Sequence, residues 1–473
     1  MNIPVDWAVV GPAVIVGIGA LVALLVDAFY PRRTWLGSGL PSSIALAWAS
    51  FELLRLQDDM VAIPFGAFTF ALSLVILGGT LVVVVASNVM NFENAMPPGE
   101  YHFLLLSASA GALMMVAARD LVTLVVALEL LSLPSIALVG LRQGDRRAVR
   151  SAWTFFLASV VSTAITLMGI SLLYGVAGTL DYDGLNEGLR STDLPDGVVA
   201  VAVVLTIIGL LFKLGAVPFH VWIPDTYVGA PVMAAGFLSS VSKAASLGAV
   251  FTLLVVALPS AFDTWSTLMA IVAAVTMTVG NIGALRQTNA VGMLAWSSIA
   301  QAGFLIAPVA ALLTRDASSA AVQYLAVYVL ANLVAFAALA VVLRLRGSND
   351  YSELKGLART DPPTGVPLVM AALTLAGFPP AVIGLVTKYV VIRPVIEAGD
   401  TWLAVVMAIN VMLGLAYYLK FVVVLVDRPA IDDPYRSPSP PVSIRISKAA
   451  VLIGTAGLVA LSAWPDLLLA NLP

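Results

Sequence analysis

Apolar runs of about 20 residues, each long enough to cross the roughly 30 Å hydrocarbon core of a bilayer, recur along the whole chain. The chain has 473 residues, of which only 11% are charged, against about 25% in soluble domains. The runs are continuous rather than alternating, which excludes a transmembrane β-barrel. The sequence therefore predicts an all-α, polytopic membrane protein.

Fourteen spans are predicted. The first is interpreted as a retained helix rather than a signal peptide, because its apolar stretch is too long and lacks a basic segment before it. The predicted spans are 8–29, 35–54, 67–90, 101–118, 120–141, 148–178, 197–222, 229–258, 265–285, 290–312, 319–345, 366–392, 401–426 and 448–470.

Basic residues divide unequally between the loops on the two sides. The loops after odd-numbered spans carry 15 Lys and Arg residues and the other loops carry five. The positive-inside rule then predicts that the first set is cytoplasmic and that both termini lie outside the inner (plasma) membrane of a prokaryote. The main cytoplasmic clusters are Arg32/Arg33, Arg142/Arg146/Arg147/Arg150, Arg344/Arg346/Lys355/Arg359 and Arg428/Arg436/Arg445/Lys448, and the five outer residues are Arg55, Arg119, Arg190, Arg315 and Arg393.

The four remaining basic residues lie within predicted spans, and all are lysines: Lys213, Lys243, Lys388 and Lys420. The chain has six lysines against 18 arginines, so this segregation is informative. An arginine cannot be deprotonated in a protein, whereas a lysine in a low dielectric can release its proton. Lys420 lies near the cytoplasmic end of its span, so it is either a proton site or a side chain that snorkels to the interface.

One acid, Glu129, lies in the middle of a predicted span. A carboxylate there costs roughly 2.5 kcal/mol or more, so a partner or a water-filled cavity is expected. A structural ion pair is the alternative to a functional role for Glu129 and for the intramembrane lysines.

Prolines interrupt two spans, in KLGAVPFHVWIP (213–224) and LAGFPPAVIGLVTK (375–388). Proline frees backbone carbonyls, which must be satisfied by protein or water inside a membrane, so such breaks line cavities. Interrupted spans in corresponding halves indicate a transporter built from inverted repeats. We predict N-terminal helices in 1–100, a first five-helix repeat in 101–258, a second, inverted repeat in 259–427, and a loop with a last helix in 428–473.

Several segments resemble the antiporter-like membrane subunits of respiratory complex I. They include LFKLGAVPFHVWIPDTYVGAP (211–231), SSVSKAASLGAV (239–250) and LTLAGFPPAVIGLVTKYVV (373–391), and the resemblance covers roughly residues 100–425. The N type of subunit is favoured by three features. Tyr227 stands where other types carry histidine, and the residue beside the break in the twelfth span is a lysine, Lys388. In addition, no long lateral helix follows the last span.

The resemblance implies roles for four residues in a proton relay. Glu129 would modulate the charge state of Lys213 beside the first break. Lys243 would connect the two halves, and Lys388 would serve the second half-channel. His220 would either join the relay or orient the turn, and Asp225 is expected to cap the next helix.

The sequence departs from the family pattern at two places. Gln301 stands where the family commonly has a histidine, so a relay there must pass through water. Val291-Gly292 replaces a basic pair, which puts a cytoplasmic contact in doubt but not the fold.

The implied function is proton translocation within an NADH-quinone oxidoreductase, with the flavin, Fe–S clusters and quinone on other subunits and no cofactor or metal on this chain. The implied partners are an M-type antiporter-like subunit, small K-, J- and A-type subunits and the lipid bilayer, with no nucleic acid. The absence of cysteine excludes disulfides and thiolate clusters here. The alternatives are a subunit of a Na⁺/H⁺ antiporter of the same fold, an independent transporter and a membrane scaffold. The electron donor stays open between NADH, F420H2 and ferredoxin.

Overall fold

The computed structural model describes residues 7–29, 35–62, 65–87, 96–192, 195–312, 314, 316–428 and 442–469. Within these ranges the chain is nearly all helical, and twelve helices are long and apolar enough to cross a membrane. The prediction of an all-α, polytopic membrane protein is therefore confirmed. Four arginines used to orient the spans lie outside the described residues: Arg32, Arg33, Arg315 and Arg436.

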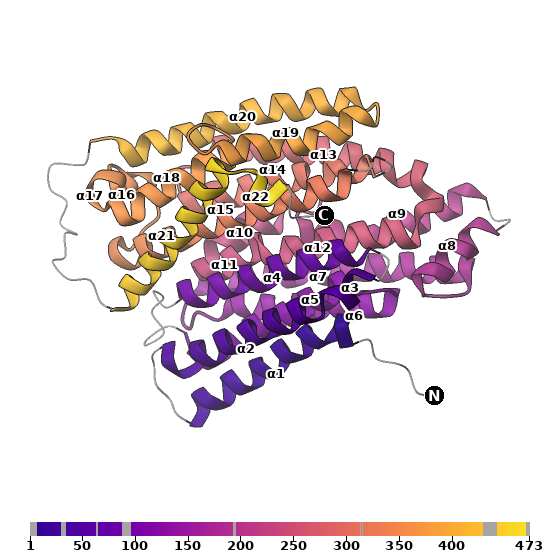
Figure 1. The fold of residues 1–473 in the computed structure, drawn as a ribbon, viewed down its shortest axis with the longest axis horizontal. Coiled ribbons are helices and arrows are strands. Elements are labelled where there is room, and N and C mark those ends of the chain that lie inside the picture. The colour runs from indigo at the N-terminus through magenta and orange to yellow at the C-terminus, as the bar shows by residue number, and fades with distance from the viewer. Residues whose placement is uncertain are drawn as a thin grey trace.

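The N-terminal helices α1 and α2 occupy one side of the bundle, and α19 (Val382–Glu397) and α20 (Thr401–Val426) occupy the opposite side (Figure 1). Helix α1 packs against α2 and α5, and α2 packs against α4. The bounds of these first helices are α1 Trp7–Phe29, α2 Trp35–Arg55, α3 Gln57–Ala62 and α4 Gly66–Ala86.

The rest of the bundle consists of two sets of long helices with short helices between them. The first set is α5 Pro98–Ala117, α6 Leu121–Gly140, α7 Arg146–Ala177, α9 Asp196–Leu214, α11 Val232–Ser239 and α12 Val241–Thr252. The second set is α13 Phe262–Leu285, α14 Ala290–Ala310, α15 Ala317–Arg346, α18 Pro362–Ala376, α19 Val382–Glu397 and α20 Thr401–Val426, followed by α21 Val442–Ala463 and α22 Asp466–Leu469. The connecting elements are α8 Tyr182–Arg190, α10 Trp222–Gly229, η2 Leu253–Ala257, η3 Pro259–Ala261, α16 Tyr351–Leu354 and α17 Leu357–Thr360.

All fourteen predicted spans have a helical counterpart. Twelve correspond to the long apolar helices, and the span 35–54 corresponds to α2, which is equally long but less apolar. The remaining span, 366–392, is two half-helices, α18 and α19, on either side of a break. The other interrupted span stops at the end of α9, so its predicted extension to residue 222 is too long.

Each of the two sets of helices contains one isolated β-bridge between segments that are far apart in the sequence. An isolated β-bridge joins Asp120 to Asp181 in the first set, and another joins Asn289 to Asp350 in the second. Asp120 and Asn289 are also the N-caps of α6 and α14, where their side chains accept the N–H of Thr123 and of Gly292. These shared features support two repeats of one design, while the residue boundaries of the repeats stay predictions. Because each predicted repeat has five spans, an odd number, the second begins on the opposite side of the membrane from the first.

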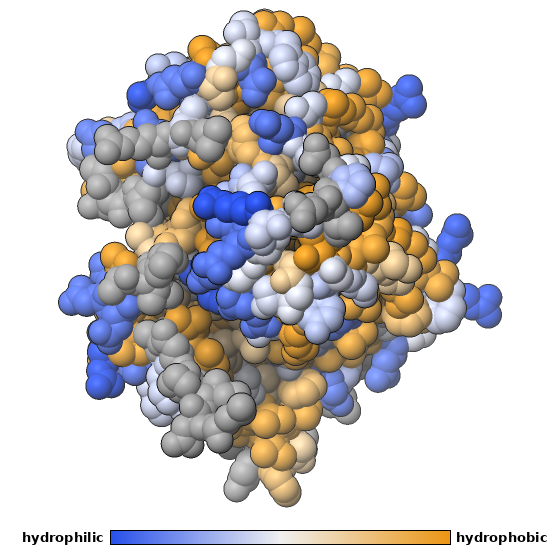
Figure 2. Space-filling model, turned by 90° about the vertical axis from the view of Figure 1, so that its right-hand side faces the viewer, coloured by the Kyte–Doolittle hydropathy of each residue, from blue (hydrophilic) through white to orange (hydrophobic). Residues whose placement is uncertain are grey.

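Burial separates central helices from peripheral ones. Helix α14 is buried over 94% of its apolar window, and α12 and α15 are nearly as enclosed, whereas α7, α20 and α21 expose most of theirs. Viewed from the α8 end, hydrophilic residues gather over part of the bundle end while hydrophobic residues cover much of the flank (Figure 2). The peripheral helices therefore offer apolar surface for lipid or neighbouring subunits, and the lysine-bearing α12 lies at the centre.

Candidate functional site

The first broken helix ends in a glycine turn. Helix α9 stops at Leu214, and Gly215 has a left-handed φ of 76°. The N–H of Ala216 donates to the carbonyl of Leu211 at 2.9 Å, which satisfies one of the carbonyls left free at the helix end. A cis Val217–Pro218 peptide bond follows. The predicted break is confirmed, and the last carbonyl of the half-helix is left for another donor.

The second broken helix ends in the same way. Helix α18 stops at Ala376, and Gly377 has a φ of 72°. The N–H of Phe378 donates to the carbonyl of Leu373 at 3.0 Å, and a cis Pro379–Pro380 bond follows. Gly377 and Pro380 thus repeat the spacing of Gly215 and Pro218 in the first break.

Buried lysines cap both half-helices at the equivalent carbonyl. Lys243 Nζ lies 2.6 Å from the carbonyl oxygen of Leu214 and 2.8 Å from that of Ser298. Lys388 Nζ lies 2.6 Å from the carbonyl oxygen of Ala376. The C-terminal end of a helix carries negative partial charge, so both sites favour an ammonium group. Two lysines from different helices therefore serve the same backbone position in the two halves.

Lys213 is buried as deeply but has no such partner. Its side chain is 1% exposed, and its Nζ lies 4.9 Å from the centre of the Phe155 ring. Within the described part of the chain this Nζ has no hydrogen-bond partner. Glu129 is partly buried and accepts a hydrogen bond of 2.6 Å from the Thr163 hydroxyl. Among the described residues no ion pair joins Glu129 to Lys213, but the carboxylate is close enough to act on the lysine electrostatically. The two residues are therefore coupled through space rather than by contact.

Two further predicted residues are less buried than these lysines. His220 is half-buried in the turn between α9 and α10, with its ring centre 5.8 Å from that of Trp296. Lys420 is exposed on α20, and its Nζ lies 5.8 Å from the centre of the Tyr351 ring. The exposure of Lys420 favours the snorkelling interpretation.

The expectation that Asp225 caps a helix is wrong. Asp225 lies inside α10, whose N-cap is Val221, and no side-chain capping bond forms there. The next helix, α11, begins after Pro231, again without a side-chain cap. Instead, the backbone carbonyl of Asp225 accepts a hydrogen bond of 2.9 Å from the Ser151 hydroxyl, which ties α10 to α7.

A network of hydroxyls and one amide extends from Lys243 toward Lys388. The Ser298 hydroxyl, whose backbone carbonyl binds Lys243, receives a 3.1 Å hydrogen bond from Tyr328. One turn away, Tyr324 donates to Gln301 Oε1, and Gln301 Nε2 donates to the Tyr418 hydroxyl at 3.2 Å. Sequence reasoning noted Gln301 only as a departure and missed both tyrosines of α15. The available signal was their spacing of four residues, which places them on one face of a helix.

A small cavity joins this network to Lys388. Its lining includes Lys388, Thr387, Gln301, Tyr324 and Tyr328, and it leaves about 10 Å³ for the centre of a water-sized molecule. That volume is about what one buried water requires. Gln301 and Lys388 therefore face one space in which a water can connect them.

The assembled groups suit proton transfer more than binding of a large solute. Lysine amines, tyrosine and serine hydroxyls and a glutamine amide all exchange hydrogen bonds. Among the described residues no group of three His, Asp or Glu side chains could hold a metal ion. Of the charged side chains on the described part of the chain, the lysines Lys213, Lys243 and Lys388 are fully buried. A burial of this kind without a direct carboxylate partner is costly in a membrane and is typical of functional sites.

Gly215 allows a test of whether the first break must keep its shape. A Cβ at Gly215 would lie 2.0 Å from Ile223 Cδ1 and 3.6 Å from Lys243 Nζ, whereas Gly347, also left-handed, has open space around it. We expect Gly215→Ala to lower the melting temperature of the assembled protein clearly, and Gly347→Ala to cost only the backbone strain of roughly 1 kcal/mol. Equal losses in thermal unfolding of the two variants would show that the packing at the first break is not restrictive.

Comparison with known proteins agrees with this geometry. The family model described as NADH:quinone oxidoreductase/Mrp antiporter, TM matches residues 118–414. A protein of Streptomyces griseus named NADH-quinone oxidoreductase subunit N 2 is 40% identical, over 98% of this chain and 93% of its own length.

Two solved structures have the same fold over nearly the whole chain. A chain of respiratory complex I from Thermus thermophilus superposes with a TM-score of 0.79 at 28% identity, covering 98% of this chain and 99% of that one. A chain of the Mrp complex from Dietzia sp. DQ12-45-1b superposes with a TM-score of 0.83 at 22% identity, covering 98% and 97%. The second likeness concerns the fold alone.

Proposed function

This chain belongs to the NADH:quinone oxidoreductase/Mrp antiporter transmembrane family, and from that premise we propose that it is the proton-translocating N subunit of a complex I-type quinone oxidoreductase. The observation that carries the proposal is the line of three buried lysines. Lys243 and Lys388 cap the two half-helices, and Lys213 lies beside the first of them. The N type is supported by the 40% sequence identity to the Streptomyces griseus subunit N 2, which extends over nearly the full length of both proteins.

The proton would move along the lysines toward the outside. With Glu129 ionised, its negative charge attracts the ammonium group and favours the protonated form of Lys213. When this attraction weakens, burial favours the neutral amine and Lys213 releases its proton. Its proton would pass to Lys243, whose ammonium is held by Leu214 and Ser298. From there it would cross the hydroxyl network to Lys388 and leave outward. Moving each charge against 100 mV costs about 2.3 kcal/mol, which the redox reaction must supply.

Other subunits would carry the redox chemistry. The resemblance places a flavin or other electron-input cofactor, Fe–S clusters and the quinone on those partners, with none on this chain. The expected neighbours in the membrane are an M-type antiporter-like subunit and the small K-, J- and A-type subunits. A charge change arriving from them would act first on Glu129, which is only partly buried on this chain.

The orientation follows from the basic loops. The arginine-rich connections, such as the one from Arg142 to Arg146 at the start of α7, would lie in the prokaryotic cytoplasm. Both termini would then lie outside, and the break-side lysines would face a route that ends on the outer surface.

A subunit of a Na⁺/H⁺ antiporter is the second candidate. The Dietzia Mrp chain supports it only as a fold, because its identity is 22%, while the 40% identical relative is named as a subunit of a quinone oxidoreductase. We therefore favour the redox-linked function.

Purification of the tagged chain with its partners separates these candidates. The chain would be extracted in mild detergent and its partners identified by mass spectrometry. We expect subunits that carry flavin or Fe–S clusters together with other antiporter-like chains. Small membrane subunits without any redox protein would move the assignment to the antiporter, and a chain that is isolated alone would contradict both.

Gln301 offers a test of the path between Lys243 and Lys388. Gln301→Leu removes both the acceptor of Tyr324 and a donor to Tyr418, each a buried group whose loss of a partner costs about 1–3 kcal/mol. We expect this variant to slow proton translocation and lower stability, and Gln301→His to preserve translocation. Proton uptake by reconstituted vesicles and thermal unfolding would be measured together. Normal translocation by Gln301→Leu would place the path elsewhere.

A further inference from the structure

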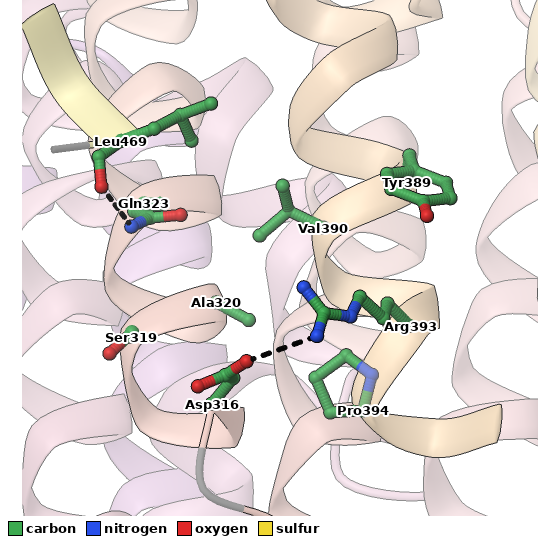
Figure 3. A pocket seen from close by; sticks show the side chains of 9 residues that line it. All are labelled: Asp316, Ser319, Ala320, Gln323, Tyr389, Val390, Arg393, Pro394 and Leu469. Carbon is green, nitrogen blue, oxygen red and sulfur yellow. Dashed lines mark hydrogen bonds and ion pairs between the residues drawn. The ribbon is translucent and has the colours of Figure 1, made fainter. Parts of the chain in front are cut away.

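A cleft of about 340 Å³ lies between α15 and α19 (Figure 3). It lies beside the N-terminal end of α15 and the C-terminal end of α19, which the proposed orientation places on the outer side. Its polar lining is Asp316, Ser319 and Gln323 from one side and Tyr389 and Arg393 from the other. The cleft is therefore large and polar enough to hold several waters at a membrane surface.

The cleft and the cavity of Lys388 are lined by neighbouring residues of α15 and α19. Gln323 lines the cleft and Tyr324 lines the lysine cavity, while Tyr389 lines the cleft and Lys388 the cavity. Neighbouring residues on the same two helices thus face the two spaces. The Gln323 side chain is 7% exposed and its amide donates a long hydrogen bond of 3.4 Å to the Leu469 carbonyl (Figure 3). A weak bond of this length leaves the amide able to turn toward water.

Arg393 links the two helices across the mouth of the cleft. Its guanidinium lies 3.6 Å from a carboxylate oxygen of Asp316, the N-cap of α15 (Figure 3). It also lies 2.7 Å from a carboxylate oxygen of Glu397 on its own helix. About half of each of these side chains is exposed, so the contacts are weak and easily broken. The ion pair therefore connects the outer ends of α15 and α19 but is weak enough to open and close.

We propose that Gln323 is the polar contact through which the proton of Lys388 reaches this cleft, and that Arg393 is a positioning residue that controls access to it. When the Arg393–Asp316 link opens, α15 and α19 can separate at their outer ends and water can reach Gln323. The inference rests on the proposed function, because it names where the translocated proton leaves. It assigns roles to residues that are absent from the relay described above.

The chain contains no cysteine, so single cysteines can report access to the cleft. Ser319→Cys at the mouth, Gln323→Cys at the floor and Leu325→Cys, a buried residue of α15 that does not line the cleft, would be placed in the intact complex. A charged, membrane-impermeant thiol reagent would be added to the outer face of sealed vesicles. The tagged chain would then be isolated and its labelling rate measured.

We expect Ser319→Cys and Gln323→Cys to be labelled from outside at least ten times faster than Leu325→Cys. Adding Arg393→Gln should speed labelling of Gln323→Cys several-fold, and Arg393→Lys, which keeps the charge, should restore the slower rate. Labelling of Gln323→Cys as slow as that of Leu325→Cys, labelling only from the cytoplasmic face, or no response to Arg393→Gln would overturn the proposal.

The same labelled protein tests the route itself. The label on Ser319→Cys, which would fill the mouth of the cleft, should lower the number of protons moved per electron pair, while unlabelled Ser319→Cys keeps most of it. Gln323→Cys, which loses the polar contact, should lower this number even without the label. An unchanged ratio after full labelling would refute the outlet. The proposed function fails separately, if replacing Lys213 leaves the ratio unchanged, because that test does not involve the cleft.

Discussion

Lys213→Met is expected to assemble and unfold like the native protein yet to lose proton translocation through this chain. Lys213 Nζ is buried without a hydrogen-bond partner, so its removal leaves no backbone group unsatisfied and relieves the desolvation of a charged group. Its Nζ lies 4.9 Å from the centre of the Phe155 ring, against which a methionine also packs well. A buried amine that contributes little to stability is explained by a role in proton transfer.

Measurement of the assembled amount, the melting temperature and vesicle acidification on one preparation would test this prediction. Lys355→Met is the matched control, because Lys355 is a half-exposed loop lysine paired with Asp427. We expect the control variant to translocate protons normally. Lys213 has a structural role instead if Lys213→Met unfolds at a much lower temperature and its acidification falls only in proportion to the amount of assembled protein.

Lys243 is expected to differ from Lys213, because its loss should damage both stability and function. Lys243→Met would leave the carbonyls of Leu214 and Ser298 without their donor, at about 1–3 kcal/mol for each buried group. Lys243→Arg keeps a cation and its donors but cannot release a proton. We expect Lys243→Arg to be more stable than Lys243→Met and equally inactive in proton translocation.

The comparison of the two Lys243 variants separates capping from proton transfer. Thermal unfolding shows how much the Lys243 cap on the α9 half-helix stabilises the protein. Proton translocation shows whether residue 243 must be able to release a proton. If Lys243→Arg pumps at the native rate, Lys243 acts as a structural cap, and the relay must pass around it. If Lys243→Arg does not assemble, Lys243→Gln, a smaller donor that does not titrate, answers the same question.

Much of the fold follows from the sequence. Long apolar runs predicted the spans, because length and hydropathy suffice to place a helix in a bilayer. The two interruptions were visible as proline clusters, and the structure ends α9 and α18 there, at Gly215 and Gly377. These features are local, so a single sequence contains them.

The contacts of the site depend on packing and could not be predicted. The sequence identified Lys243 and Lys388 as intramembrane cations, but their partners are backbone carbonyls at 2.6 Å, and every residue has such a carbonyl. Likewise Tyr324 and Tyr328 became part of the path only because α15 lies against Gln301 and Ser298 of α14. Hydropathy identified the buried lysines, the resemblance suggested their roles, and the three-dimensional arrangement shows which groups lie between them.

The capping prediction failed for a local reason. Asp225 was expected to cap the next helix, but α10 begins before it, at Trp222. The first residue of α10 is buried, and the Trp222 ring stacks on Phe155 with the ring centres 4.2 Å apart. Tertiary packing therefore overrode the local signal for a helix start.

The number of protons moved per electron pair, measured in liposomes that contain the purified complex, shows whether Lys213 takes part in proton translocation. Native protein and Lys213→Met would be compared while electron transfer to quinone is recorded in the same sample. We expect a lower ratio in Lys213→Met, together with normal assembly. An unchanged ratio at a normal rate of electron transfer would contradict a role of Lys213 in translocation, and the buried lysines would then need a different explanation.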